Sequence, residues 1–324
     1  MTGLAQNTRP HGREGAGTQR PPTAARLQRW IAQITILVPA VAAAGAVSLT
    51  ITGIARPTWL ELGLAAALCL VTQLGITVGF HRFFTHRSFQ TVPIVRLLLG
   101  VAGSMAAQGP LLFWVSEHRE HHQKSDSAGD PHSPYFDGAT VLNRLRGFWH
   151  AHVGWMLDHW SSAWHTNARD IFSERLSLRI SQFYLLWVAA GVVLPGLIAG
   201  IWYGSLKQAA LGAVWGGLVR IFLVHHATWS VNSIGHMFGR RAYDTADQSR
   251  NNAFVALISC GEGWHNNHHA FPSSARHGLG PGQWDMSYAV IRLLARAGLA
   301  HNLKLPSAGL VKRGKGSNSF EIAS

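Results

Sequence analysis

The stretch from Ile31 to Ile54 carries no charged residue, and this feature restricts the possible folds more than any other. A helix of that length spans a hydrocarbon core of roughly 30 Å. Three further apolar stretches lie at residues 59–80, 183–202 and 209–231. The composition agrees, because 47% of the residues are hydrophobic and only 13% are charged. The sequence therefore predicts an all-α integral membrane protein with four transmembrane helices.

The two ends of the chain differ from the rest in composition. Residues 1–29 hold five arginines and one glutamate among Pro, Gly, Thr and Gln, which is typical of a disordered basic tail. The first apolar stretch exceeds the roughly 7–15 residues of a signal-peptide core, so cleavage is not expected. Residues 30–303 are expected to form one membrane domain, and residues 304–324 a flexible basic tail.

The arginines also predict the orientation of the chain. If the Arg-rich start stays in the cytoplasm, four spans place residues 81–182 and everything after residue 231 on the same side, as a helical cap. Both termini would then be cytoplasmic, in a multi-pass protein of the inner (plasma) membrane. The net charge of +13 is spread among apolar spans and forms no single basic face, which argues against a nucleic-acid partner. We interpret the excess as contact with anionic lipid.

Nine of the 19 histidines fall into four clusters. These are His81 and His86; His118, His121 and His122; His236; and His265, His268 and His269. The segments 118–122 and 265–269 each place histidines at i, i+3 and i+4, on one face of a helix. Two such helices facing each other can hold two metal ions between them, which predicts a multi-metal site of neutral nitrogen ligands.

The remaining candidate ligands have less regular spacing. His81 and His86 are five residues apart, more than one α-helical turn, so they are expected to project from a helix end toward different sides of one site. His236 is the expected ninth ligand, and Asn232 can hold a metal-bound water. His225 and His226 lie within the fourth span, where ionisable groups are costly and often functional. They lack the cluster spacing, so a structural role near the site and ligation both stay open.

The ligand type favours two iron ions that activate oxygen. Structural zinc closes with four ligands and prefers thiolates, and nine imidazoles exceed what one such ion uses. Cys69 and Cys260 lie far apart in unlike contexts, so neither a thiolate site nor a disulfide is predicted. Catalytic zinc is the alternative, but it accounts for fewer of the histidines.

The histidine motifs resemble those of a known family. Residues 77–89, TVGFHRFFTHRSF, are similar to the first histidine box of the integral-membrane fatty-acid desaturases of the stearoyl-CoA and acyl-lipid delta-9 type. The box HREHH with the following GDPHSP, the sequence NSIGH at 232–236 and GEGWHNNHH at 261–269 complete the pattern in the family's order. Residues 108–117 are more similar to the bacterial branch of the family.

This resemblance implies a fold and a reaction. The fold would be four transmembrane helices beneath a cytosolic cap that holds a dinuclear iron centre, with the nine histidines as ligands and Asn232 ordering a water. The reaction would remove two hydrogens from adjacent methylene carbons of a long saturated acyl chain, using O2 and two electrons. The product would most often be a cis double bond at the ninth carbon. No side-chain acid or nucleophile is required, and no paired catalytic carboxylates are expected.

The resemblance also implies substrates and partners. The acyl chain would be bound to CoA, a glycerolipid or a carrier protein, and the bacterial-type sequence before the second box favours the last two. A ferredoxin or similar donor with its reductase would supply electrons. Regioselectivity requires a narrow apolar tunnel, for which the candidate walls are Trp114, Trp155, Trp229 and Trp264. An interfacial aromatic belt is the alternative role for each of these tryptophans.

Two other functions fit part of the pattern. A membrane hydroxylase or related oxygenase would use the same kind of site, but the spacing of the first histidines follows the desaturases. A non-catalytic membrane protein that sequesters metal belongs to a different class. It predicts that replacing His265 changes no acyl product.

Overall fold

The computed structural model describes residues 22–135, 140–158 and 164–314, and nearly all of the regular structure there is helical. In chain order, with η for π-helices, the elements are α1 (Pro22–Ile51), α2 (Trp59–Leu74), η1 (Gly75–Thr85), β1 (Gln90–Thr91), α3 (Pro93–Met105), α4 (Leu111–Lys124), α5 (Val141–Trp149), η2 (His150–Gly154), α6 (Trp155–Asp158), α7 (Trp164–Asn167), α8 (Arg169–Ser173), α9 (Arg175–Gln182), α10 (Tyr184–Tyr203), α11 (Leu206–Gly212), η3 (Ala213–Val219), α12 (Arg220–Met237), α13 (Ala253–Ile258), α14 (His265–Ala270), α15 (Met286–Arg296), β2 (Ala300–His301) and α16 (Ala308–Gly314). The two strands pair antiparallel.

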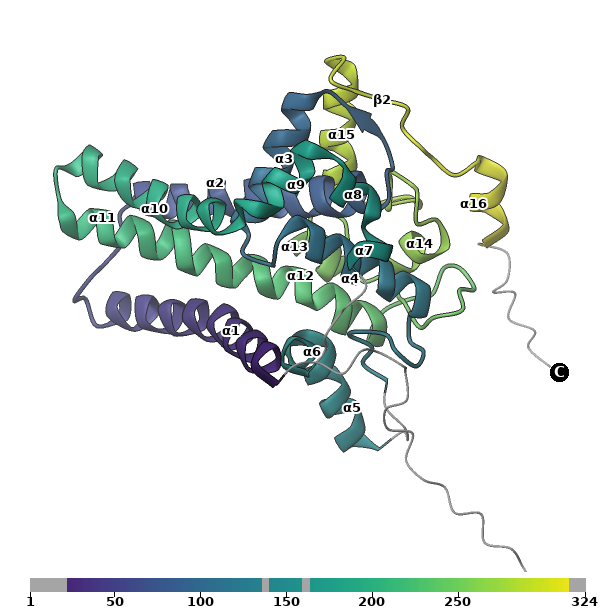
Figure 1. Cartoon of the computed structure of the whole chain (residues 1–324), viewed down its shortest axis with the longest axis horizontal. Helices are drawn as coiled ribbons and strands as arrows, with labels where there is room; N and C mark the ends of the chain where they lie inside the picture. Colours follow the sequence, from purple (N-terminus) through teal and green to yellow (C-terminus); the bar gives the residue numbers. More distant parts are fainter. Residues whose placement is uncertain (1–21, 136–139, 159–163, 315–324) are drawn as a thin grey trace, which may run out of the picture.

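Four helical segments are long and apolar enough to cross a membrane. They are Arg26–Ile51, Trp59–Thr85, Tyr184–Tyr203 and Leu206–Met237, and each overlaps one of the four predicted spans. They extend toward one end of the molecule, and the shorter helices gather at the other (Figure 1). Large apolar side chains such as Leu185 remain exposed on them, as expected of helices that contact lipid. The chain is therefore a mostly helical protein with the features of membrane association.

Helices extend into both of the predicted tails. Helix α1 begins at Pro22, so residues 22–29 of the predicted disordered tail are helical in the structure. Their helix continues directly into the apolar stretch and extends it by two turns. Helix α16 likewise occupies part of the predicted flexible tail at 304–324. Residues 1–21 and 315–324 lie outside the described residues.

Local sequence explains where the long helices begin and end. Thr58 caps α2 and forms a capping box with Glu61, which satisfies backbone N–H groups at the helix start. Gly204 ends α10 in the left-handed conformation, with φ of 58°, and Ser205 then caps α11 through the N–H of Gln208. This glycine and serine make the tight turn between the third and fourth long helices.

Arg220 lies buried within the fourth long helix and stabilises neighbouring helices through their carbonyl groups. Its guanidinium donates to the carbonyl oxygens of Met105 at 2.6 Å and Gly191 at 2.8 Å, and to that of Gly216. All three of these acceptors are backbone carbonyls within or at the ends of helices. The charge thereby joins α3, α10 and η3.

The shorter helices pack around the C-terminal end of α2 and its continuation η1. A core cluster of Phe80, Leu111, Val115 and Ile180 joins η1 to α4 and α9. A second cluster, which includes Val78 and Ile291, joins η1 to α15 and the chain near β2. The segment that carries His81 and His86 is therefore held on two sides by buried apolar contacts.

Helix α3 approaches η1 closely because both carry glycine at the contact. A Cβ atom added to Gly75 would lie 2.3 Å from the backbone nitrogen of Gly103, and one added to Gly103 would lie 2.5 Å from the Phe80 ring. Small residues allow helix backbones to approach in this way. By contrast, a Cβ on Gly63 of α2 would meet no atom within 4 Å.

We expect Gly75→Ala to destabilise the purified protein in detergent, because the new methyl group clashes with backbone that cannot move independently. Overpacking of this kind costs about 1–3 kcal/mol. Gly63→Ala is the matched control on the preceding helix and should be neutral or slightly stabilising, because alanine is the better helix former. Thermal unfolding followed by circular dichroism measures both. Equal midpoints for the two variants would contradict the close contact.

Candidate metal centre

The structure brings all nine clustered histidines together in two adjacent groups. His81, His86, His118, His122 and His268 form one, called here the five-histidine group. His121, His236, His265 and His269 form the other, called the four-histidine group. Within each group the candidate ligand atoms lie within 4.8 Å of one another. Most of these side chains are buried, since they lie where α4 and α14 meet η1 and the end of α12.

Both HxxHH segments divide their histidines between the two groups in the same way. In α4, His118 and His122 belong to the five-histidine group and His121 to the other. In α14, His265 and His269 belong to the four-histidine group, whereas His268 points to the five-histidine group. Residues at i and i+4 thus share one group, and the residue at i+3 reaches the second. This arrangement agrees with the expectation that two facing helices hold two ions.

His81 and His86 join the same group because the helix that carries them is a π-helix. The N–H of His86 donates to the carbonyl oxygen of His81 at 3.1 Å, an i to i+5 hydrogen bond. Their ring centroids lie 4.8 Å apart. The expectation that they reach different sides of the site assumed α-helical geometry. A π-turn places residues five apart in register, and such turns occur frequently at functional sites.

The ring nitrogens of the five-histidine group face each other across a small space. Nε2 of His268 lies 3.1 Å from Nε2 of His81 and 2.9 Å from Nε2 of His122. Nε2 of His118 lies 3.1 Å from those of both His86 and His122. The five ring nitrogens therefore converge. One N–H hydrogen can bridge only one pair of nitrogens, so it leaves other nitrogen lone pairs facing each other. A cation between the rings would accept all of the remaining lone pairs.

Carboxylates fix the protonation of several rings. Nδ1 of His81 lies 2.7 Å from a carboxylate oxygen of Glu262. Three other histidines donate Nδ1–H to an aspartate: His121 to Asp130 at 2.9 Å, His236 to Asp126 at 2.8 Å and His269 to Asp247 at 2.8 Å. In a neutral ring this leaves Nε2 unprotonated and free to bind metal. The buried Nε2 of His121 indeed has no hydrogen-bond partner among the described residues. The donor set thus fits a pair of divalent metal ions.

Burial keeps the cap histidines in the form that binds metal. Burial, followed by the charge of neighbouring histidines, holds the pKa of His118 and of His122 well below its ordinary value. Burial lowers the pKa of His269 to about 4, although Asp247 opposes the shift. Burial alone would raise the pKa of Asp247, but its hydrogen bond from His269 lowers it overall. Neutral imidazoles beside ionised carboxylates are the states that metal ligation requires.

These carboxylates were not predicted from the sequence, where Asp126, Asp130, Asp247 and Glu262 were given no role. A signal was present, because metal-binding histidines usually donate their second N–H to a carboxylate or carbonyl. Asp126 and Asp130 follow the second box within eight residues, and Glu262 precedes the last box by three.

Several histidines outside the clusters have defined structural contacts. His277 is buried with Nδ1 at 3.0 Å from Glu262, and its ring lies 4.5 Å from that of His268. His132 stacks on His121 at 4.2 Å. His225 bonds through Nε2 to the carbonyl oxygen of Ala106 at 2.9 Å, which gives it a structural role.

His226 contacts the ring of His152, with His226 Nδ1 and His152 Nε2 2.9 Å apart. The other nitrogen of His152 lies 2.9 Å from the hydroxyl of Ser233. None of these residues belongs to the two groups of described histidines. His226 therefore joins η2 to α12 beside the centre.

A mostly apolar cavity of about 420 Å³ ends at the five-histidine group. Its walls come from the start of α1, the start of α4, α6, α10 and α12, and they include His118, Asn232 and three of the four predicted tryptophans, Trp114, Trp155 and Trp229. Trp264 is not part of the wall; its indole N–H donates to the carbonyl oxygen of Trp284 at 2.7 Å. Trp114 stacks on the ring of His118, with centroids 5.0 Å apart.

Hydrogen bonds fix the cavity wall near the histidines. The side-chain amide of Gln108 donates to the hydroxyl of Thr228 at 2.9 Å, and the N–H of Gly109 donates to the hydroxyl of Tyr184 at 3.0 Å. Asn232 lies on α12 one turn before His236 and faces this cavity. The cavity therefore reaches residues close to both groups.

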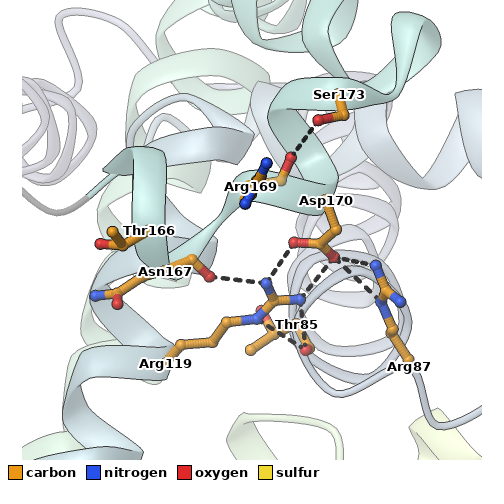
Figure 2. Close-up of a pocket in the computed structure, with 8 residues that line it drawn as sticks. All are labelled: Thr85, Arg87, Arg119, Thr166, Asn167, Arg169, Asp170 and Ser173. Carbon is orange, nitrogen blue, oxygen red and sulfur yellow. Dashed lines mark hydrogen bonds and ion pairs between the residues drawn. The ribbon is translucent and has the colours of Figure 1, made fainter.

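A network of hydrogen bonds and ion pairs at a surface pocket fixes η1 against α4 (Figure 2). Arg119, which follows His118, donates to the carbonyl oxygens of Phe84 and Thr85 at the end of η1. It also forms an ion pair with Asp170 at 2.6 Å, and Asp170 in turn pairs with Arg87. The last carbonyls of a helix lack internal partners, so Arg119 caps η1 next to His86.

Comparison with known proteins identifies the family. A family model described as fatty acid desaturase matches residues 57–290. The hex-5-enoyl-[acyl-carrier protein] acetylenase of Moorena producens (strain JHB) is 40% identical over 273 residues, which cover 82% of this chain and 85% of that protein. The sn-1 stearoyl-lipid 9-desaturase of Anabaena variabilis is 40% identical over 254 residues, 76% of this chain and 85% of that protein. Delta-9 acyl-lipid desaturase 1 of Arabidopsis thaliana is 37% identical over 263 residues, 79% of each.

The chain therefore belongs to the fatty acid desaturase family, and the prediction of this family from the histidine motifs is confirmed. It is an oxidoreductase that acts on fatty acyl chains. The histidine motifs, at residues 77–269, lie within the matched region, which extends from the start of α2 into α15.

We expect Arg119→Gln to lower the unfolding free energy, because it removes an ion pair and leaves helix-end carbonyls unsatisfied. Hydrogen bonds to charged groups contribute about 1.5–3 kcal/mol, so a loss of about 2 kcal/mol is expected. Arg169→Gln is the control, since Arg169 lines the same surface pocket and its side chain is exposed. Thermal unfolding and the iron content of the purified protein are the measurements. Unchanged stability in Arg119→Gln would show that this cap does not hold the site.

Proposed function

We propose that this member of the fatty acid desaturase family introduces a cis double bond at the ninth carbon of a long saturated acyl chain, using O2 and two electrons at a centre of two irons. The observation that supports this most strongly is the pair of histidine groups at the end of an apolar cavity. The nine histidines would hold the two irons, and Asn232 would order a water. When bound, the irons supply the oxidising chemistry that removes two hydrogens from the chain.

The residues of the cavity bind and orient the acyl chain. Trp114 and His118 both line the cavity and their rings stack, so an acyl chain in the cavity contacts the indole beside the five-histidine group. Trp155 and Trp229 form other parts of the wall and exclude water from the methylene groups that react. Fixed positions of this kind select one pair of adjacent carbons, since a shift of one carbon places a different C–H bond at the centre.

The cavity favours an acyl chain carried by a membrane lipid. Leu27, Ile31 and Ala32 of α1 form one wall, and α1 is one of the four helices apolar enough to cross a membrane. The lining contains no lysine or arginine among the described residues, whereas a CoA carrier brings phosphates that arginine and lysine usually bind. Relatives named as stearoyl-lipid and acyl-lipid desaturases support the same class of substrate.

The electrons would come from a ferredoxin or similar donor with its reductase. A surface pocket of about 580 Å³ exposes edges of His86, His122 and His269, and it shares no lining residue with the acyl cavity. A soluble donor could approach the centre there without displacing the substrate. With the Arg-rich start in the cytoplasm, this pocket and both termini would face the cytoplasm from the inner membrane.

Expression in a bacterium together with a ferredoxin and its reductase tests the function. We expect new monounsaturated chains in the membrane lipids, with the double bond at the ninth carbon by mass spectrometry, and none with His265→Ala. The purified wild type should contain two irons per chain. Hydroxylated chains would instead identify a hydroxylase, triple bonds an acetylenase, and an unchanged profile with bound metal a non-catalytic protein. Products only on CoA or carrier protein would contradict the lipid substrate.

We expect Ala32→Trp to reduce desaturation of long chains, because Ala32 is buried in the cavity wall and a larger side chain fills the space. A loss of about tenfold or more corresponds to 1.4 kcal/mol of lost binding to the transition state. Ala44→Trp is the control, since Ala44 is exposed on the same helix. Product yield and iron content are measured together. Full activity with Ala32→Trp would exclude this cavity as the acyl site.

A further inference from the structure

The two histidine groups differ in the charge that surrounds them. In the four-histidine group, His121, His236 and His269 each donate Nδ1–H to an aspartate, at 2.9, 2.8 and 2.8 Å. In the five-histidine group, His81 is the one described member with a carboxylate beside its ring, that of Glu262, with Nδ1 2.7 Å from the nearer oxygen. Three of the four histidines in the four-histidine group therefore have a carboxylate partner, compared with one of the five in the five-histidine group.

The single carboxylate of the five-histidine group is paired with a neighbouring cation. Glu262 accepts from the guanidinium of Arg82 at 3.1 Å, and Arg82 is fully buried. Arg82 also pairs with Asp285 at 2.9 Å, and His277 contacts Glu262 from the other side. Part of the negative charge of Glu262 is therefore balanced within the protein before any metal binds, because Arg82 is shared between two carboxylates.

The three aspartates of the four-histidine group have no such cation among the described residues. Asp126 accepts from the N–H of Gln248 and the hydroxyl of Ser133. Asp130 accepts from the N–H groups of Asp126 and His132. Their remaining contacts are to the histidine rings.

Asp247 is likewise held by neutral donors and by a histidine ring. It accepts from the N–H of Ser249 and the hydroxyl of Thr245, and its other contact is to His269. All three carboxylates are therefore held by neutral donors. Three buried negative charges around the four-histidine group are costly unless a cation among its rings balances them.

These charges favour metal binding in two ways. A carboxylate that accepts from Nδ1–H makes the opposite nitrogen a stronger donor, and changing such a partner weakens metal binding by about 10–100-fold. Uncompensated negative charge also attracts a divalent ion directly, and the attraction is strong where water is excluded. The five-histidine group offers one more neutral imidazole. One neutral ligand adds less to the affinity for a divalent ion than three anionic partners do.

We propose that the four-histidine group binds its divalent metal more tightly than the five-histidine group and fills first. This inference rests on the proposed two-metal centre and adds an order to its assembly. It makes Asp126, Asp130 and Asp247 positioning residues that act through their histidines. A chain with limited metal would then hold one ion, in the four-histidine group.

Titration of the metal-free, full-length protein with Co²⁺ alone tests the order, with a chromophoric chelator as competitor. The wild type should bind two Co²⁺ in steps at least tenfold apart in affinity. In Asp247→Asn we expect the tighter step to weaken by about 10–100-fold, with the weaker step unchanged. His86→Ala should remove the weaker step and retain the tighter one.

Asp244→Asn is the matched control for the aspartate variant. Asp244 lies three residues earlier on the same loop, and its side chain is 98% exposed. Both steps should be unchanged in it. If Asp247→Asn does not fold, Asp126→Asn tests the same effect through His236.

The outcomes separate the inference from the proposed function. Two Co²⁺ ions bound with equal affinity, or a loss of the tighter step in His86→Ala, would overturn the order and leave the two-metal centre in place. Fewer than two Co²⁺ per wild-type chain would instead overturn the centre itself, and the order with it.

Discussion

Repulsion between ring nitrogens is the constraint on which the rest of this structure depends. Nine imidazoles are held so that their unprotonated nitrogens face each other in two small, buried spaces. Without cations such an arrangement is unfavourable, so the surrounding protein must hold it in place. Three features hold η1, and with it His81 and His86, in place. They are the cap by Arg119, the apolar clusters around η1 and the glycine contact with α3.

Much of this centre could be predicted from the sequence because its main signals are local. Spacing of i, i+3 and i+4 determines which side chains share a helix face, whatever the tertiary structure. The long apolar stretches likewise depend on composition alone, and all four match helices of sufficient length. Three of four tryptophans that flank the histidine boxes line the cavity, since residues next to a ligand lie next to the space that the ligand faces.

The signals that were missed depend on tertiary contacts. His81 and Glu262 are distant in sequence, and no local pattern pairs them. The π-helix that aligns His81 with His86 inserts an extra residue per turn, which propensities do not reveal. The helical start of α1 was missed because its residues are polar and basic, although the apolar helix that follows extends through them. Trp264 flanks a histidine box as the other tryptophans do. Its indole N–H, however, donates to the carbonyl oxygen of Trp284, away from the cavity wall.

The way α4 and α14 each contribute to both groups has a consequence for biosynthesis. Neither group can be completed from the first half of the chain, because each needs residues of α14. A nascent chain therefore has no complete metal position until residues 265–269 have left the ribosome and packed against α4. Metal binding must then follow synthesis of all four long helices, which precede α14 in the chain. A chain that ends before α14 would carry partial sets of histidines, without a finished place for either ion.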